Sequence, residues 1–143
     1  MTRVDFYVSN QPGQAARLTL ACRIAEKAYQ QKHQIYLHAG SAEQAQAIDA
    51  QLWTFRAGSF IPHALVGDEM ADQCPILIGY EHTPDSHTDV LINLDQQVPS
   101  FFSRFERVAE LINQDEETRQ QGRDRFRFYR DRGYALETHN LND

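Results

Sequence analysis

The hydrophobic positions in the first part of the chain alternate between two periodicities. A β-rich run at residues 4–8 ends in a Ser, Asn, Pro and Gly turn cluster, and apolar residues then recur at helical spacing from residue 14 to residue 31. A second extended run at residues 35–38 precedes Ser41, which suits the N-cap of a second helix. That helix directs three apolar residues inward: Ala45, Ile48 and Leu52. This order of elements predicts a parallel sheet with crossover helices.

Two continuous apolar runs follow, at residues 76–80 and 89–94, and they are typical of strands buried on both faces. Residues 101–112 fit a helix or a strand, and we favour a short turn at Phe101 and Phe102 followed by a strand. A further helix is expected from Asp115 to Gly133. The pattern predicts an α/β fold: one Rossmann-like domain over residues 1–143, with a mostly parallel central sheet flanked by helices.

The first strand-to-helix turn is where many such folds carry a phosphate-binding loop. Here residues 9–15 read Ser-Asn-Gln-Pro-Gly-Gln-Ala, with neither a Gly-x-Gly-x-x-Gly fingerprint nor a Gly-Lys-Ser/Thr ending. Closely spaced glycines and a lysine let backbone amides surround a pyrophosphate. We therefore expect no nucleotide-binding loop and no cofactor.

The expected last helix contains the one strongly basic segment of the chain. Residues 119–132 hold six arginines against two aspartates in a protein whose net charge is −6. Helical spacing aligns four of the arginines on one face, with Phe126 beside them: Arg119, Arg123, Arg127 and Arg130. A solvated, ion-paired face is the usual explanation of such a row. Few acids are spaced to neutralise it here, so an exposed anion-binding face is the better prediction.

The middle segment, residues 52–69, combines exposed-looking aromatics with irregular spacing. We expect a turn at Gly58 and a short extended piece at Phe60 and Ile61 that ends at Pro62. The aromatic side chains, Trp53 and Phe60 among them, suit a protein interface, and burial in the domain's own core is equally consistent with the pattern. His63 with Asp68 or Glu69 would suit acid–base chemistry or a metal, but a polar loop explains these residues better.

The remaining polar residues carry weaker signals. His82 and His87 lie in a polar turn, where solvated side chains are more common than metal ligands. Cys22 and Cys74 have no motif around them and predict buried thiols rather than a disulfide or metal pair. No apolar run reaches membrane-spanning length, and the N-terminus lacks a signal-peptide core, so a cytoplasmic protein is expected. The negative net charge argues against nucleic acid as a partner over the whole surface.

Several sequence blocks together are similar to one family. Six blocks resemble the chi subunit of bacterial DNA polymerase III. They are Leu52-Trp53, Ser59-Phe-Ile-Pro-His63, Pro75-Ile-Leu-Ile-Gly79, Leu91-Ile-Asn-Leu94, Phe105-Glu-Arg-Val-Ala-Glu110 and the Gly122–Tyr134 segment. The resemblance implies a non-catalytic clamp-loader accessory subunit of Rossmann-like fold. It also implies two partners, the psi subunit and the acidic C-terminal tail of single-stranded DNA-binding protein.

The resemblance assigns residues to each partner. Its tail-binding positions fall on Arg119, Arg123, Phe126 and Arg127. Its psi-facing positions fall on Trp53 and Phe60, with neighbours Ile61, Pro62 and His63. Family members often have tryptophan or tyrosine where this chain has Phe126, so the stacking surface is kept and a polar atom is lost.

Other functions stay open from the sequence. One is a small α/β enzyme that uses His63, and another is direct binding of single-stranded nucleic acid through the arginine-rich helix. A repair helicase is a possible competitor of psi for the Trp53 surface.

Overall fold

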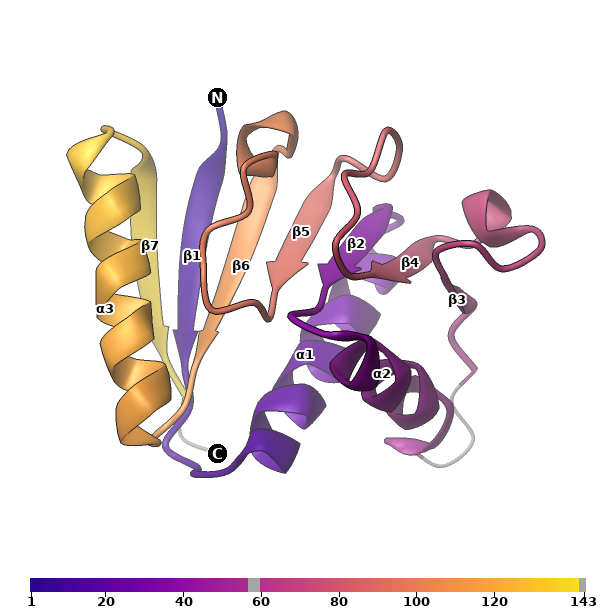
Figure 1. Ribbon diagram of the computed structural model, residues 1–143, viewed down its shortest axis with the longest axis horizontal. Helices are drawn as coiled ribbons and strands as arrows, with labels where there is room; N and C mark the ends of the chain where they lie inside the picture. The colour runs from indigo at the N-terminus through magenta and orange to yellow at the C-terminus, as the bar shows by residue number, and fades with distance from the viewer. Residues whose placement is uncertain (57–59, 142–143) are drawn as a thin grey trace.

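One parallel sheet organises the protein, whose structure is a computed structural model that describes residues 1–56 and 60–141. Seven strands lie side by side in the order β3-β4-β2-β5-β6-β1-β7, and every neighbouring pair is parallel (Figure 1). The strands are β1 (Arg3–Val8), β2 (Ile35–His38), β3 (His63–Leu65), β4 (Ile76–Gly79), β5 (Val90–Asn93), β6 (Arg107–Ile112) and β7 (Ala135–Asn140).

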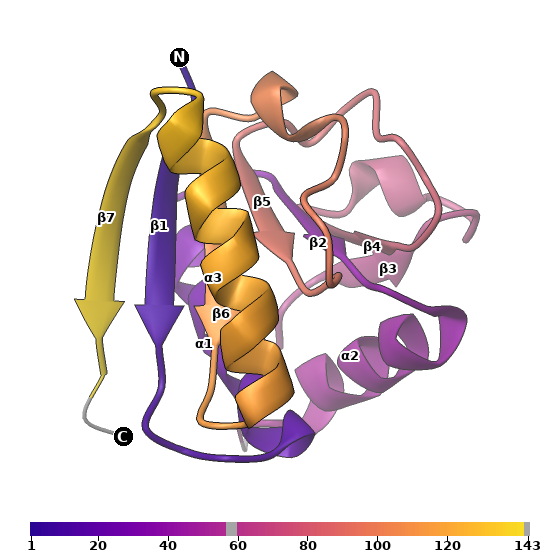
Figure 2. The ribbon, with the colours of Figure 1, turned by 60° about the vertical axis from the view of Figure 1, so that its left-hand side comes forward.

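The helices lie on opposite faces of this sheet because of the order of the strands. The helices are α1 (Gln14–Gln30), α2 (Ala42–Thr54) and α3 (Glu116–Asp131), with short 3-10 turns η1 (Ala71–Gln73) and η2 (Phe102–Arg104). The β1-to-β2 and β2-to-β3 connections cross the sheet in one direction, and the β6-to-β7 connection crosses it in the other. Right-handed crossovers therefore place α1 and α2 on one face and α3 on the opposite face (Figure 2).

Alternation along the strands fills a separate core on each face. Ile35 and Leu37 of β2 pack with the residues of α1 and α2, whereas Tyr36 between them packs with the aromatic residues under α3. Side chains of successive strand residues point to opposite faces, so the continuous apolar runs supply both cores. Every residue of β4 and β5 is buried, which confirms the prediction that the runs at residues 76–80 and 89–94 form strands buried on both faces.

The local signals at the helix ends are also confirmed. The Ser41 hydroxyl accepts a hydrogen bond from the Gln44 N–H at 3.1 Å and caps α2. Gly133 follows α3 with φ 78°, a left-handed conformation that glycine adopts without strain. Region 101–112 divides as predicted, into the η2 turn and strand β6.

One prediction about local structure is wrong, and one strand was missed. Strand β3 begins after Pro62, at His63, directly beyond the extended piece expected at Phe60 and Ile61. His87, expected to be solvated, is buried, and its ring contacts Ser86 Oγ at 2.7 Å and the Cys74 carbonyl at 2.6 Å. The edge strand β7 was not predicted at all. The turn expected at Gly58 lies outside the described residues.

The two cysteines were predicted to be buried thiols without a disulfide, and Cys74 departs from this in its burial. Both thiols are free, Cys22 buried and Cys74 half-buried. Burial raises the pKa of the Cys22 thiol to about 12, which keeps it protonated and unreactive at neutral pH. In the described part of the chain, no helix combines the length and apolar character needed to cross a membrane.

Candidate functional site: a groove beside the last helix

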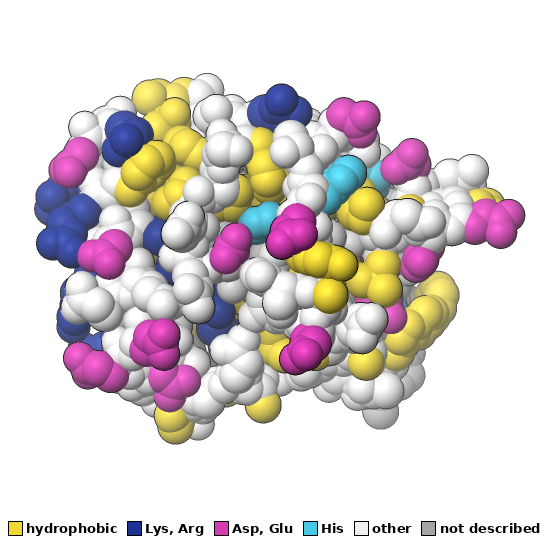
Figure 3. Space-filling model, viewed as in Figure 1, with side chains coloured by type: hydrophobic (Ala, Val, Ile, Leu, Met, Phe, Trp, Pro, Cys, Tyr) yellow, Lys and Arg dark blue, Asp and Glu magenta, His cyan; other side chains and the backbone are white. Residues whose placement is uncertain are grey.

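Helix α3 presents a row of arginines along the side that faces β7. Four of them are exposed: Arg119, Arg123, Arg127 and Arg130. The helix begins after Asp115 with Glu116 and Glu117 in its first turn, where acids complement the positive end of the helix dipole. Figure 3 shows Lys and Arg side chains gathered at the edge formed by α3, with Asp and Glu spread over the rest of that face. The predicted basic face is present.

A groove of about 190 Å³ lies between α3 and the sheet. Arg119, Arg123 and Phe126 of α3 line it on one side. Its floor comes from three strands, with the residues Phe6, Val8, Ile112 and Thr138. Phe126 is half-buried and packs edge-on against Phe6, with ring centroids 5.2 Å apart. The groove therefore combines an apolar floor with two guanidinium groups at its rim.

Gly122 explains why α3 lies so close to this floor. A Cβ atom at this position would stand 2.2 Å from Ile112 Cδ1, well inside van der Waals contact. The missing side chain lets the helix approach β6 and sets the depth of the groove.

The arginines of the row differ in how far acids neutralise them. Arg127 is ion-paired with Asp124, and Arg130 with Asp131 at 3.1 Å, so the expectation of few neutralising acids is wrong for these two. Arg123 Nη1 donates to the Gln120 side-chain oxygen at 3.4 Å. Within residues 1–56 and 60–141, neither Arg119 nor Arg123 has a carboxylate partner. The two arginines at the groove are thus the ones available to bind an external anion.

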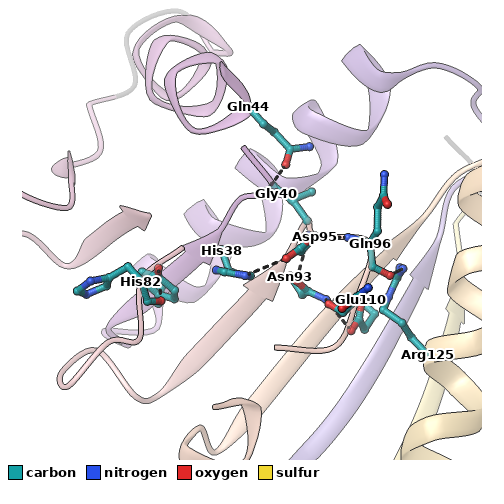
Figure 4. Close-up of polar contacts among 12 residues, drawn as sticks. His38, Gly40, Gln44, His82, Asn93, Asp95, Gln96, Glu110 and Arg125 are labelled. Carbon is teal, nitrogen blue, oxygen red and sulfur yellow. Dashed lines mark hydrogen bonds and ion pairs between the residues drawn. The ribbon is translucent and has the colours of Figure 1, made fainter. Parts of the chain in front are cut away.

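A fifth arginine of the same helix is buried and has a different role. Arg125 Nε donates to Glu110 Oε1 at 2.8 Å, with both side chains almost completely buried. The Tyr129 hydroxyl donates to Glu110 Oε2 at 2.7 Å. Asn93 Nδ2 donates to the same oxygen at 3.0 Å (Figure 4). This network fixes α3 on β6 and so fixes the rotation that turns Arg119 and Arg123 toward the groove.

A second candidate surface lies at the end of α2. Trp53 is 49% exposed and Phe60 is 67% exposed, and their ring centroids are 5.4 Å apart. Ile61 and His63 are buried, and Pro62 is half-buried. Of the five residues that the family resemblance assigned to a psi interface, the structure therefore leaves Trp53 and Phe60 as the main exposed groups.

The geometry around His63 differs from that of the acid–base pair considered from the sequence. The Trp53 ring covers His63, with centroids 4.5 Å apart. His63 Nδ1 contacts the Ile61 carbonyl at 2.7 Å, and Nε2 lies 3.4 Å from Asp49 Oδ1. Asp68 instead accepts a hydrogen bond from the Leu65 N–H. The structure pairs His63 with Asp49 and not with Asp68 or Glu69, which removes the geometric basis of that enzyme hypothesis.

The turn where a nucleotide would be expected is closed by the protein's own carboxylate. The Gly13 N–H donates to both Asp115 carboxylate oxygens, at 3.2 and 3.3 Å, and Asn113 Nδ2 donates to the Gly13 carbonyl at 3.0 Å. An anion bound at this amide would meet the negative charge of Asp115. This agrees with the prediction that the chain has no nucleotide-binding loop.

One group of side chains has the composition of a metal site. Ligand atoms of Asp5, Glu137 and His139 lie within 4.8 Å of one another. Arg3, however, is ion-paired with Asp5 and with Glu137, and Arg107 Nε lies 3.5 Å from Asp5. Guanidinium groups already compensate the two carboxylates, so a metal would have to displace Arg3.

His38, the last residue of β2, should make the free energy of unfolding depend on pH. Burial lowers the pKa of the His38 imidazole below 6.5, and the Asp95 carboxylate 3.3 Å away only partly opposes this. As pH falls below about 6.5, the unfolded chain binds this proton and the folded chain does not, so the free energy of unfolding declines. Urea unfolding at several pH values should show a shallower decline in His38→Gln than in the wild type. Equal pH dependence of the two proteins would contradict the prediction.

Two solved structures share the fold at low sequence identity. The crystal structure of T4 UvsW superposes with a TM-score of 0.67 at 10% identity, over 97% of this chain and 42% of that one. The Mss116p DEAD-box helicase domain 2 bound to an RNA duplex gives a TM-score of 0.60 at 9% identity, over 98% of this chain and 65% of that one. The chain thus spans less than two thirds of each, and the likeness shows an α/β fold alone.

Sequence comparison gives a much closer relationship. The family described as DNA polymerase III chi subunit, HolC, matches residues 1–137. The protein named DNA polymerase III subunit chi from Pseudomonas aeruginosa is 46% identical over 141 residues, 99% of this chain and 98% of that protein. Proteins of the same name from Haemophilus influenzae and Escherichia coli are each 28% identical and are matched over 96% of this chain. The chain therefore belongs to the DNA polymerase III chi subunit family.

Proposed function

We propose that this chi subunit connects the psi subunit to the acidic C-terminal tail of single-stranded DNA-binding protein, without a catalytic site of its own. Membership of the family makes the chain an accessory subunit in DNA replication. We assign one partner to each candidate surface: the tail to the groove beside α3, and psi to the surface formed by Trp53 and Phe60. In this proposal the protein acts in the cytoplasm and contacts DNA only through its partners.

The observation that carries the proposal is the composition of the groove beside α3. A C-terminal tail of this kind offers side-chain carboxylates, a terminal α-carboxylate and a terminal aromatic ring. Arg123 is able to take the terminal carboxylate in two parallel hydrogen bonds, and Phe126 with Phe6 offers an apolar contact for the ring. Arg119 and Arg127 would attract the upstream acids at longer, salt-screened range.

A pull-down with two forms of the cognate single-stranded DNA-binding protein tests this proposal. The full-length form should be retained by the immobilised chi subunit, and a form without its last residues should not. Bare single-stranded DNA serves as the control ligand, since direct nucleic-acid binding would give salt-sensitive retention without any protein tail. Equal retention of the two protein forms would show that the tail is not what binds, and would contradict the proposal.

The second surface supports a protein partner of a different kind. Trp53 and Phe60 expose adjoining aromatic rings, and rings of this size supply much of the binding free energy at protein interfaces. Trp53 lies at the end of α2, and Figure 1 shows α2 and the edge strand β3 on the opposite side of the sheet from α3. This separation would allow psi and the tail to bind at the same time. The same surface would be open to a competing helicase when psi is absent.

Phe60→Ala should weaken psi binding by about 2 kcal/mol, because the truncation removes an exposed anchoring ring. The melting temperature of the isolated chain should hardly change, since the ring is 67% exposed. Calorimetric titration with psi and a thermal melt of the same sample measure both quantities. Ile61→Ala is the matched comparison, since its buried side chain should mainly stabilise the fold. Destabilisation without a binding defect in Phe60→Ala would mean that the ring serves the fold.

A further inference from the structure

The sheet has two edges, and only one of them is long and regular. Strand β3 forms one edge with three residues and follows Pro62, both features that protect an edge from pairing. Strand β7 forms the other edge with six residues, Ala-Leu-Glu-Thr-His-Asn, and contains neither proline nor lysine. Among the described residues, β7 pairs with β1 alone, and Figure 2 shows it at the outside of the sheet. Edge β7 lacks the common protective features.

The hydrogen bond at the end of β7 shows which of its amides face outward. The Leu141 N–H donates to the Val8 carbonyl at 2.9 Å, so this residue points toward β1. Strand residues alternate with a period of two, and in a parallel pair the N–H and C=O of one residue point the same way. Glu137 and His139 therefore also pair with β1. The N–H and C=O groups of Leu136, Thr138 and Asn140 point away from the sheet.

These outward groups lie next to the arginine row. Thr138 lines the α3 groove together with Arg119 and Arg123. The last turn of α3 returns to the start of β7, where the Tyr134 N–H bonds the Tyr129 carbonyl, so Arg127 and Arg130 lie near the first residues of the strand. The one charged side chain of β7, Glu137, is ion-paired with Arg3. A chain added along this edge would thus have the arginine row on its α3 side, where Arg127 and Arg130 are paired only with exposed aspartates of their own helix among the described residues.

We infer that an acidic, extended peptide whose carboxyl end occupies the α3 groove continues upstream as an eighth strand on the free edge of β7. This inference rests on the proposed function, because the groove must first hold the end of the peptide. Backbone hydrogen bonds to Leu136 and Thr138 would hold the chain, and alternate side chains would face α3. Acids at those alternate positions would compete across solvent with Asp124 and Asp131 for Arg127 and Arg130.

The position of the groove fixes the direction of the added strand. The groove lies beside Thr138, toward the end of β7, while Arg127 and Arg130 lie beside its beginning. A peptide that places upstream acids near these arginines and its carboxyl end in the groove must run in the same direction as β7. The eighth strand is therefore parallel, like every other pair in the sheet.

Amide hydrogen exchange measured by NMR on the intact chain tests this inference. The probe is a synthetic peptide of alternating aspartate and serine that ends in phenylalanine. At saturating peptide, exchange at the Leu136 and Thr138 amides should slow by about tenfold or more, because they gain a partner strand. The Glu137 and His139 amides serve as internal controls, since they are already paired with β1. The Arg123 Nε resonance reports independently whether the groove is occupied.

The outcomes separate the strand from the groove. A shifted Arg123 resonance with unchanged exchange at Leu136 and Thr138 would overturn the eighth strand and leave the proposed function standing. No change in either signal would overturn both. A peptide with the aspartates moved by one position, at equal charge, should bind roughly threefold or more weakly if alternate side chains face α3. Equal affinity of the two peptides, or a dimer of the chain that the peptide does not dissociate, would also overturn the inference.

Discussion

Glu110→Ala should lower the free energy of unfolding by about 3–5 kcal/mol, the largest effect on stability that we expect from a single change. The substitution leaves the Arg125 guanidinium buried without its carboxylate and removes the acceptor of the Tyr129 hydroxyl. A buried cation without a partner is costly because burial removes its hydration. Urea denaturation followed by circular dichroism measures the change directly.

Two further variants separate the charge from the packing. Glu106→Ala is the matched control, because this exposed residue of the same segment should change stability by less than about 0.5 kcal/mol. Replacing both members of the pair, Glu110→Leu with Arg125→Met, removes the charges together and should recover much of the loss. A double variant as unstable as Glu110→Ala would show that packing or the hydrogen bonds lost by Tyr129 and Asn93, and not the unpaired charge, account for the effect.

The sequence predicted those elements whose local pattern of apolar residues matches their burial in the folded chain. The β2, β4 and β5 strands are continuous apolar runs, and burial on both faces requires that composition. The alternation at residues 105–111 correctly indicated β6 rather than a helix. The absence of a phosphate loop was also readable, because that loop depends on residues adjacent in sequence.

The two edge strands escaped prediction for different reasons. β7 is mostly exposed, and its polar sequence has no apolar face to mark it. It forms because α3 returns the chain beside β1, a tertiary cause with no local sign. β3 has only three residues, too few for a periodicity to show, and it begins two residues after the extended piece expected at Phe60 and Ile61.

The charged residues inside the fold were missed for a related reason. Arg17 lies on the predicted first helix, yet it is buried and donates to the carbonyls of Leu111 and Leu94 at 3.1 and 3.3 Å. Burial lowers its pKa to about 10. Its partners are distant in sequence, as Glu110 is from Arg125, and only the folded chain brings them together. Helical spacing did exclude Arg125 from the exposed row, although it gave no partner for it.

Arg125 and Arg123 show how one helix serves the fold and the groove with the same residue type. Two positions along a helix differ by about 200° around its axis, so the two side chains leave α3 in nearly opposite directions. One enters the buried network with Glu110, and the other reaches the rim of the groove. A rotation of α3 about its axis would therefore disturb both the buried network and the groove. Because Glu110 holds Arg125, it also helps to position Arg123, although it does not line the groove.

Arg123→Ala should weaken binding of the single-stranded DNA-binding protein tail roughly tenfold or more, because hydrogen bonds to a charged group are worth about 1.5–3 kcal/mol. Arg123 is exposed and unpaired with acid within the described residues, so its truncation leaves the fold intact. Arg123→Lys should recover only part of the affinity, since an ammonium group cannot form two parallel hydrogen bonds with one carboxylate. Calorimetric titration of a tail peptide measures the three affinities.

Arg132→Ala is the matched control for charge. This exposed arginine of the same segment stacks on Phe128, with its Cζ 3.6 Å from the ring centroid, and does not line the groove. Arg132→Ala removes the same charge as Arg123→Ala but should change the affinity for the tail much less. High salt should reduce that small effect further. Equal losses from the two variants would mean that the tail responds to the general positive charge of α3. A specific loss at Arg123 that persists in high salt would instead locate the terminal carboxylate at the groove.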